Sequence, residues 1–315
     1  MKAPLRPWKR LDAEFRRLAE QELKRASADL AAPEGAEREE GIHEARKRLK
    51  HLRALLRLVR RGHAAFYKTE NTRYRDAARR LSAVRDRTAL IEALTALEKR
   101  YGLAAGTSFA AARTTLEARR DAAAGTDMGP AIEATLADLA EAREHASHFT
   151  LPHRPDKAGR IVASGYAETH ARARKALAKA METEDADDLH ELRKHAKYQS
   201  LQLKVIEPLW PRAFAPLREI AATIADELGS DHDLAVLAAE IAADPGKFGG
   251  KEEREALVTL IGQRQSELRA SAIVAAERLL IDRRSAVRRR IRRLWKVAGQ
   301  KAARPAKPAK IEELD

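Results

Sequence analysis

The sequence predicts an all-α protein made of two pseudo-symmetric four-helix bundles around a central basic groove. The composition is rich in Ala and Leu, aromatic residues make up only 4%, and there are only 15 Gly among 315 residues. Strong helix formers therefore dominate, and residues that favour strands are few. Apolar residues recur at helical spacing along the chain, and one strongly basic segment has a counterpart in the second half.

The central element is the segment 42–61, which we expect to be a helix that begins among residues 37–41 and ends at Gly62. Its apolar residues recur in steps of three and four and predict a core-facing stripe: Ile42, Ala45, Leu49, Leu52, Leu56 and Val59. A second stripe at the same spacing is basic: His43, Arg46, Lys47, Lys50, Arg53, Arg57 and Arg60. Like charges at this spacing repel one another, so their persistence predicts an anionic partner.

The segment 189–206 repeats this pattern 147 residues later. His190, Arg193, Lys194 and Lys197 stand in the places of His43, Arg46, Lys47 and Lys50. At the same offset, LSAVRDRTAL (81–90) aligns without gaps to LGSDHDLAVL (228–237). The chain thus predicts two copies of a unit of roughly 150 residues, a first bundle at 5–150 and a second at 157–298. We expect the Ala/Lys/Pro-rich residues 299–315 to be disordered.

The remaining helices follow from apolar periodicity and from helix breakers. In the first copy we expect helices at 8–30, from about 66 or 70 to 85, and at 87–102, 107–124 and 130–148. Two prolines mark a linker at 151–156. In the second copy we expect helices at 161–181, from 189 to Pro208, and at 214–228, 231–243, 252–271 and 273–297. No segment predicts a strand.

The charge balance restricts the class of partner. The formal net charge of +14 indicates nucleic acid, an anionic membrane or another polyanion. The chain has no Cys, which excludes disulfides and thiol chemistry. The start MKAPLRPWKR has no apolar run, and no later segment has the apolar length of a membrane span. We therefore expect a cytoplasmic protein without a membrane partner.

Two features suggest catalysis at first sight. HELRKH (190–195) resembles a zinc-protease motif, but that motif needs a second His at the position of Lys194. Asp86, Asp231 and Asp233 offer carboxylates for metal-dependent phosphate hydrolysis, yet we expect them to cap helices or to pair with an Arg. No glycine-rich phosphate loop occurs. We therefore expect no catalytic residue, metal or cofactor, and a metal-dependent phosphatase or polyphosphatase is the alternative.

A binding function fits the basic stripes better. Cations on one helix face recur about every 5.4 Å, a row that a linear polyphosphate or a nucleic-acid backbone can follow. Arg offers paired donors, Lys a mobile charge, and His a ring N–H. Single-strand binders add aromatic platforms for bases, but only Tyr198 stands within a basic segment. A polyanion without bases is favoured, and non-specific RNA binding is a further alternative. The Arg cluster at 283–293 predicts a solvated face.

The two HExRKxxK segments, LSxxRD at 81–86 and the run LHELRKHAK…EPLWP…LGSDHDLAVL at 189–237 closely resemble the CHAD family, the conserved histidine α-helical domain. THARARKA (169–176) is similar to the family's segment before the second motif. The resemblance covers about residues 5–297. It implies two four-helix bundles whose basic residues line a central groove or cavity, and binding of inorganic polyphosphate at polyphosphate granules.

The resemblance also implies site residues. In the two basic motifs they are His43, Arg46, Lys47, Lys50 and Arg53, and His190, Arg193, Lys194 and Lys197. Arg75, Arg79 and Arg85 lie in the matching third-helix element and Arg174 in the segment before the second motif, while the basic stripe adds Arg57. The second copy departs from the family at His195, where Arg is frequent, and at Ser200, which leaves Arg53 without a basic counterpart. These departures bear on how much the second copy contributes to the affinity for polyphosphate.

Overall fold

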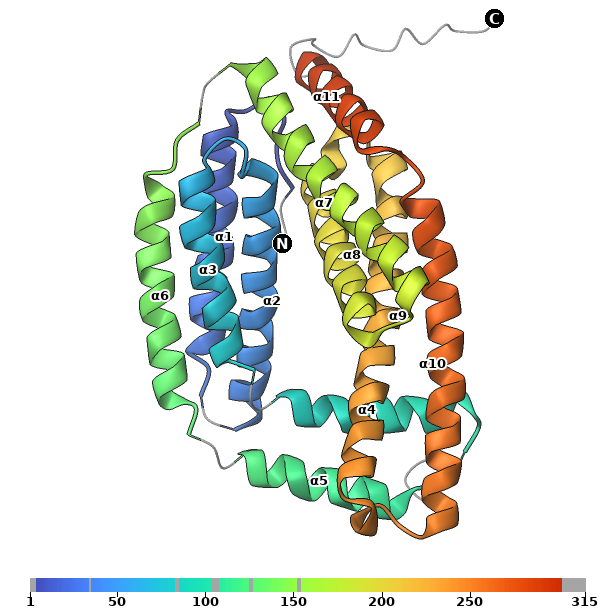
Figure 1. Ribbon diagram of the computed structural model, residues 1–315. Helices are drawn as coiled ribbons and strands as arrows, with labels where there is room; N and C mark the ends of the chain where they lie inside the picture. The colour runs from blue at the N-terminus through green and yellow to red at the C-terminus, as the bar shows by residue number, and fades with distance from the viewer. Residues whose placement is uncertain are drawn as a thin grey trace, which may run out of the picture.

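The computed structural model describes residues 4–33, 35–82, 85–103, 108–124, 127–151 and 154–301, without the side chains of 36, 85, 86, 123, 124, 155 and 301. Within these ranges the chain consists of helices and their connections, with no strand (Figure 1). The predicted all-α class is confirmed. Residues 302–315, most of the tail for which we expect disorder, lie outside the described residues.

The first half contains six helices close to the predicted ones: α1 (Leu11–Leu30), α2 (Ala36–Val59), α3 (Ala64–Arg80), α4 (Arg85–Arg100), α5 (Ala110–Ala124) and α6 (Gly129–Ser147). Helices α1, α2, α3 and α6 pack together as one bundle. Helices α4 and α5 run from the lower end of this bundle to the lower ends of α9 and α10 in the second half (Figure 1). The predicted proline linker is shorter than expected, because the next helix already begins at Pro155.

The second half contains α7 (Pro155–Thr183), α8 (Ala186–Ile206), α9 (Pro211–Ala243), α10 (Lys251–Leu279) and α11 (Arg284–Lys301). Short 3-10 turns, η1 (Glu207–Leu209) and η2 (Pro245–Lys247), flank α9. The predicted break between helices at 228–231 is wrong, since α9 runs through it without interruption. Asp231 does not cap a new helix; its carboxylate accepts a hydrogen bond from Nε of Arg269 on α10 at 2.7 Å.

The break that we expect near residue 272 is also displaced. Helix α10 continues to Leu279, and the chain breaks between there and Arg284 instead. Ala272 and Ala276 are fully buried along α10 and belong to a core that α7, α8, α9 and α10 share. This packing keeps the segment helical past the predicted end, because burial of an apolar face stabilises a helix more than local propensity does.

Three groups of buried residues hold the helices together. The largest joins α1, α2, α3 and α6 to α7, α8 and α11, so the two halves share one core. A second core lies between α4, α5 and the adjoining ends of α9 and α10. Helices α4 and α5 of the first copy thus pack against the second copy. The division into 5–150 and 157–298 and the pseudo-symmetry of two bundles stay predictions.

Helix α2 is held directly against the second half. A Cβ atom at Gly165 of α7 would lie 2.3 Å from the carbonyl oxygen of Leu58, so only glycine allows α7 to approach α2 so closely. On α8, Gln202 donates a hydrogen bond to the carbonyl oxygen of Ala54 at 3.2 Å. These two contacts position the C-terminal part of α2 beside both α7 and α8. None of the described helices combines the length and apolar character of a bilayer span.

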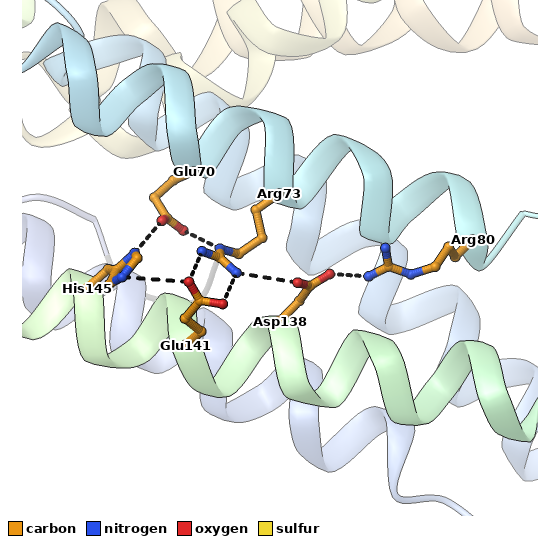
Figure 2. A network of polar contacts seen from close by, with 6 residues as sticks. All are labelled: Glu70, Arg73, Arg80, Asp138, Glu141 and His145. Atoms are coloured by element: carbon orange, nitrogen blue, oxygen red, sulfur yellow. Dashed lines mark hydrogen bonds and ion pairs between the residues drawn. The ribbon is translucent and has the colours of Figure 1, made fainter.

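Helix α3 is fixed to α6 by a polar network (Figure 2). The guanidinium of Arg73 donates to Glu141 at 2.6 Å and to Asp138 at 3.3 Å, and lies 3.3 Å from the fully buried Glu70. His145 of α6 contacts the same Glu70 at 2.9 Å. The network pairs Arg73 and Arg80, the cations on one side of α3, with carboxylates of α6. The opposite side of α3 faces α2.

Candidate functional site

The two basic helices meet at one point. The guanidinium carbon of Arg57 on α2 lies 3.8 Å from the ring centroid of Tyr198 on α8, and that of Arg53 lies 5.8 Å from it. Tyr198 is only 5% exposed, so its ring is a rigid surface for both cations. The basic stripe of α2 therefore contacts the basic helix of the second copy.

Hydrogen bonds fix the two arginines of α2 at this junction. Asn71 of α3 accepts from Nε of Arg53 at 3.2 Å and from Nη1 of Arg57 at 2.9 Å. Nη1 of Arg57 also donates to the carbonyl oxygen of Arg53. Burial lowers the pKa of Arg57 below its ordinary value, although a guanidinium retains its proton throughout the physiological range. Two oriented positive charges result, held by neutral partners.

Further cations surround the junction. Arg172 of α7 is close enough for its charge to lower the pKa of Arg57 and of Arg60, in both cases behind the larger effect of burial. Glu168 accepts from Arg60 and from Arg172, both at 3.4 Å, and Arg61 and Arg284 reach the same carboxylate. One carboxylate among so many guanidinium groups leaves an excess of positive charge where α2, α7 and α8 meet.

His195 of α8 lies inside this junction. Burial, followed by the charges of Lys194, Arg172 and Arg57, lowers the pKa of His195 to about 4, although Glu191 opposes this shift. The imidazole is therefore neutral at physiological pH. At this position, where the resembled family often has Arg, the chain places a neutral, 8% exposed side chain.

The N-terminal half of α8 faces α9. The ring centroids of His190 and His232 are 5.5 Å apart, and burial, then the charges of His232, Arg193 and Lys194, lower the pKa of His190. Arg193 packs over Gly229 of α9, where a Cβ atom would lie 3.2 Å from its Nη2. The charged Arg193 and the imidazole of His190 thus lie side by side against α9.

The two lysines of α8 that belong to the predicted site already have acidic partners. Nζ of Lys197 donates to Asp226 of α9 at 3.1 Å, and Lys194 pairs with Glu191 one turn away on its own helix. Any polyanion that binds these lysines must compete with the two carboxylates. The second copy therefore offers fewer free charges than its sequence suggests.

The basic residues of the first copy extend over α2 and α3. His43, Arg46 and Lys50 each have a polar or electrostatic partner within the fold, and Lys47 pairs with Glu44. On α3, Arg75 and Arg79 follow Asn71 at steps of four residues and so share the side of α3 that contacts the arginines of α2. Both are exposed and lie within ion-pair distance of Asp76, at 2.9 and 3.4 Å.

Arg85 and Arg174 are the remaining predicted site residues. The side chain of Arg85 is outside those that the structure describes. Arg174 is exposed, and its charge contributes, after burial, to a lowered pKa of His170, whose ring contacts the carbonyl oxygen of Asp282 at 2.8 Å. Arg174 therefore lies near the loop before α11, whereas Arg172, two residues earlier, lies at the junction of α2 and α8.

Sequence reasoning missed Arg172 and Asn71. Arg172 stands on α7, outside the two basic segments 42–61 and 189–206, and Asn71 is a single amide among charged residues of α3. Arg172 is brought to the site by the packing of α7 on α2, two helices distant in sequence, and Asn71 by the packing of α3 on the preceding helix α2. The available signals for Arg172 are its place in the segment THARARKA (169–176), two residues before Arg174, and its spacing of four residues from Glu168.

A metal-dependent reaction would need carboxylates that are free to coordinate. Asp231 is 3% exposed and is bound by Arg269 and Gln265. Asp233 also has a partner, and the side chain of Asp86 is outside the described residues. In the described part of the chain, no group of three His, Asp or Glu side chains is arranged to hold a metal ion. The expected ion pair of Asp231 with an Arg is thereby confirmed.

Comparisons with known proteins identify the family of the chain and a solved structure with a similar fold. A family model described as the CHAD domain matches residues 19–242. The fold is similar to the crystal structure of the CHAD domain from the plant Ricinus communis, with a TM-score of 0.61 over 89% of this chain and 94% of that chain. Sequence identity to that domain is 19%, so this likeness concerns the fold. No curated protein matches the chain.

Proposed function

The chain belongs to the CHAD domain family, and we propose that it binds inorganic polyphosphate through the basic residues of α2 and α8. The observation that carries the proposal is the contact of Arg57 on α2 with Tyr198 on α8. It joins the two basic helices, and Arg172 and Arg60 add positive charge at the same place. Every predicted anion ligand on α2 is within four turns of this contact.

Linear polyphosphate suits such a surface because it repeats one anionic group along its whole length. Successive turns of α2 present cations about 5.4 Å apart, and arginines can donate two hydrogen bonds to a phosphate. Binding releases condensed counterions, so affinity falls with salt. If about six cations bind phosphates, the slope of log K against log salt is about −4, by analogy with single-stranded nucleic acid.

The two helices would contribute unequally. Lys194 and Lys197 are paired with Glu191 and Asp226, whereas Arg53 and Arg57 are held by the neutral Asn71 and Tyr198. A phosphate therefore meets less competition from carboxylates at Arg53 and Arg57 of α2 than at Lys194 and Lys197 of α8. We further propose that the protein acts in the cytoplasm at polyphosphate granules and binds the polymer without hydrolysing it.

The test is a polyphosphate titration of the wild type beside variants Lys50→Glu, Arg193→Glu and the double variant His43→Ala/His190→Ala. Arg212→Glu is the matched control, because Arg212 is exposed on α9 and has no ion pair with any described residue. Arg16 is unsuitable as a control, since its Nη1 donates to the carbonyl oxygen of Phe149 at 2.6 Å. We expect each site variant to weaken binding at least tenfold more than Arg212→Glu. Equal losses in all variants would mean that net charge alone drives binding.

Two further measurements separate the alternatives. Release of phosphate from polyphosphate by the purified protein with Mg²⁺ or Mn²⁺ would favour a metal-dependent polyphosphatase, which needs metal ligands on Asp86, Asp231 or Asp233. Displacement of polyphosphate by single-stranded RNA at physiological salt would favour RNA as the ligand of α2 and α8. We expect no phosphate release and no such displacement.

A further inference from the structure

A cavity of about 1100 Å³ lies away from α2 and α8, between the N-terminal segment, the start of α7 and the whole length of α11. Its wall on α11 includes five cations: Arg288, Arg289, Arg292, Arg293 and Lys296. Lys9 and Arg160 add further positive charge, and Trp8 lines the opposite side. The arginine cluster at 283–293, for which the sequence predicted only a solvated face, therefore contributes to one wall of a cavity.

Packing fixes the orientation of α11. Val287, Ile291 and Trp295 follow one another at steps of four residues and are buried, so the remaining face of the helix carries the cations outward. Trp295 packs on Gly159 of α7, where a Cβ atom would lie 2.8 Å from the indole. Because no larger residue fits at Gly159, the position of α11 against the start of α7 is well defined.

The five cations of this wall make no ion pair with any carboxylate of the described residues. Their neighbours on α11 differ, since Arg284 pairs with Glu168 and Arg290 with Asp282. Asp156, an acid of the cavity wall, already pairs with Arg160. Elsewhere in the fold most arginines have carboxylate partners, so this concentration of unpaired charge favours an anionic ligand.

The geometry distinguishes between classes of anion. Arg288, Arg292 and Lys296 follow one another at steps of four residues and so are spaced about 6 Å apart along α11. Trp8 leaves 49% of its surface exposed at the same cavity. A row of cations beside an open aromatic ring is the arrangement by which proteins bind single-stranded nucleic acid, with phosphates on the cations and a base stacked on the ring. A polyphosphate has no group that would use the indole.

We propose that this cavity binds a short single-stranded segment of RNA or DNA, with its phosphates on α11 and one base on Trp8. The site is separate from the polyphosphate site proposed on α2 and α8 and does not depend on it. Recognition is independent of base sequence, because the side chains that we assign contact only phosphates and the face of a base.

The test is fluorescence anisotropy of a labelled 12-nucleotide oligouridine at about 100 mM salt, with the full-length protein. We expect Arg289→Glu/Arg293→Glu to weaken oligouridine binding at least tenfold. The control Arg212→Glu/Arg278→Glu makes the same change in charge at exposed positions on α9 and α10 that have no ion pair with any described residue. It should change oligouridine binding less than threefold. Trp8→Ala should weaken it about tenfold and Trp8→Phe much less, since stacking needs a ring. His43→Ala/His190→Ala should leave it unchanged.

Two results would overturn the proposal. Equal losses in the α11 pair and the α9/α10 pair would show attraction by net charge. An unchanged affinity in Trp8→Ala would show that no base stacks on Trp8. The proposed polyphosphate site has its own readout, because the His43/His190 variant should lose polyphosphate and keep oligouridine.

Discussion

Arg193 of α8 lies flat over Gly229 of α9, so close that a Cβ atom at residue 229 would be 3.2 Å from its guanidinium. The contact orients the arginine without a carboxylate partner, and it leaves the charge free for phosphate. It also shows why a glycine is useful inside the continuous helix α9, where its low helix propensity costs about 1 kcal/mol.

Substitution of this glycine tests whether the position of Arg193 matters as well as its charge. Gly229→Leu should displace the guanidinium and weaken polyphosphate binding severalfold at unchanged net charge. Gly262→Leu is the control, because Gly262 of α10 is also helical and has no atom within 4 Å of its Cβ position. Titration of both variants should separate them, and identical affinities would show that Arg193 is not positioned for binding.

The ring of Tyr198 should matter more than its hydroxyl. Tyr198→Phe keeps the surface on which Arg57 lies and should retain both stability and affinity. Tyr198→Ala removes a buried ring and should lower the free energy of unfolding by about 3 kcal/mol, with a severalfold loss of polyphosphate affinity. Urea unfolding and titration check the pair. If Tyr198→Ala binds as well as the wild type, Arg57 does not need this contact.

Acid should destabilise the fold through His195. Its pKa is about 4 in the folded protein and about 6.5 in the unfolded chain, so the unfolded state takes up the proton first as pH falls. The contribution is fully present above pH 6.5 and is lost as pH falls toward 4, by at most about 3 kcal/mol. His195→Gln should reduce the pH dependence of the free energy of unfolding, measured with urea between pH 7.5 and 5. His148→Gln, at an exposed position after α6, should leave that pH dependence unchanged. Parallel pH profiles for His195→Gln and the wild type would contradict this.

Two arginines of α3 should affect different properties, one the stability of the fold and the other the affinity for polyphosphate. Arg73→Ala leaves the buried Glu70 without its guanidinium partner and should lower stability by about 3 kcal/mol, with little change in polyphosphate affinity (Figure 2). Arg75→Ala should weaken polyphosphate binding and change stability little, because Arg75 is exposed beside Asp76 and shares the helix face of Asn71. Thermal unfolding and titration of both variants measure this. A loss of affinity in Arg73→Ala alone would move the site to the other side of α3.

Much of the fold follows from the sequence because apolar periodicity and prolines are local signals. The first six helices appear close to their predicted bounds. The break predicted at 228–231 fails because the Gly-Ser-Asp sequence looks like a helix end, whereas Arg269, 38 residues away on α10, binds Asp231. The packing of α4 and α5 on the second half is likewise a long-range effect that no local pattern contains.

The candidate site is predicted less completely. The basic stripes locate Arg53, Arg57 and Arg193, but they do not show that Asp226 and Glu191 already bind Lys197 and Lys194. Nor does any spacing reveal that Arg172 reaches the junction from α7 or that Asn71 orients two arginines. These properties depend on which helices meet, and that becomes known only from the fold.

The central claim is that one polyphosphate chain binds α2 and α8 together, and chain length tests it most directly. Calorimetric titrations should compare short and long polyphosphate on the wild type, on Arg193→Glu and on the control Arg212→Glu. We expect the wild type and the control to bind the long chain at least tenfold more tightly per chain, and Arg193→Glu to lose most of this advantage. If Arg193→Glu keeps the full preference for long chains, α8 does not share a site with α2, and the claim is contradicted.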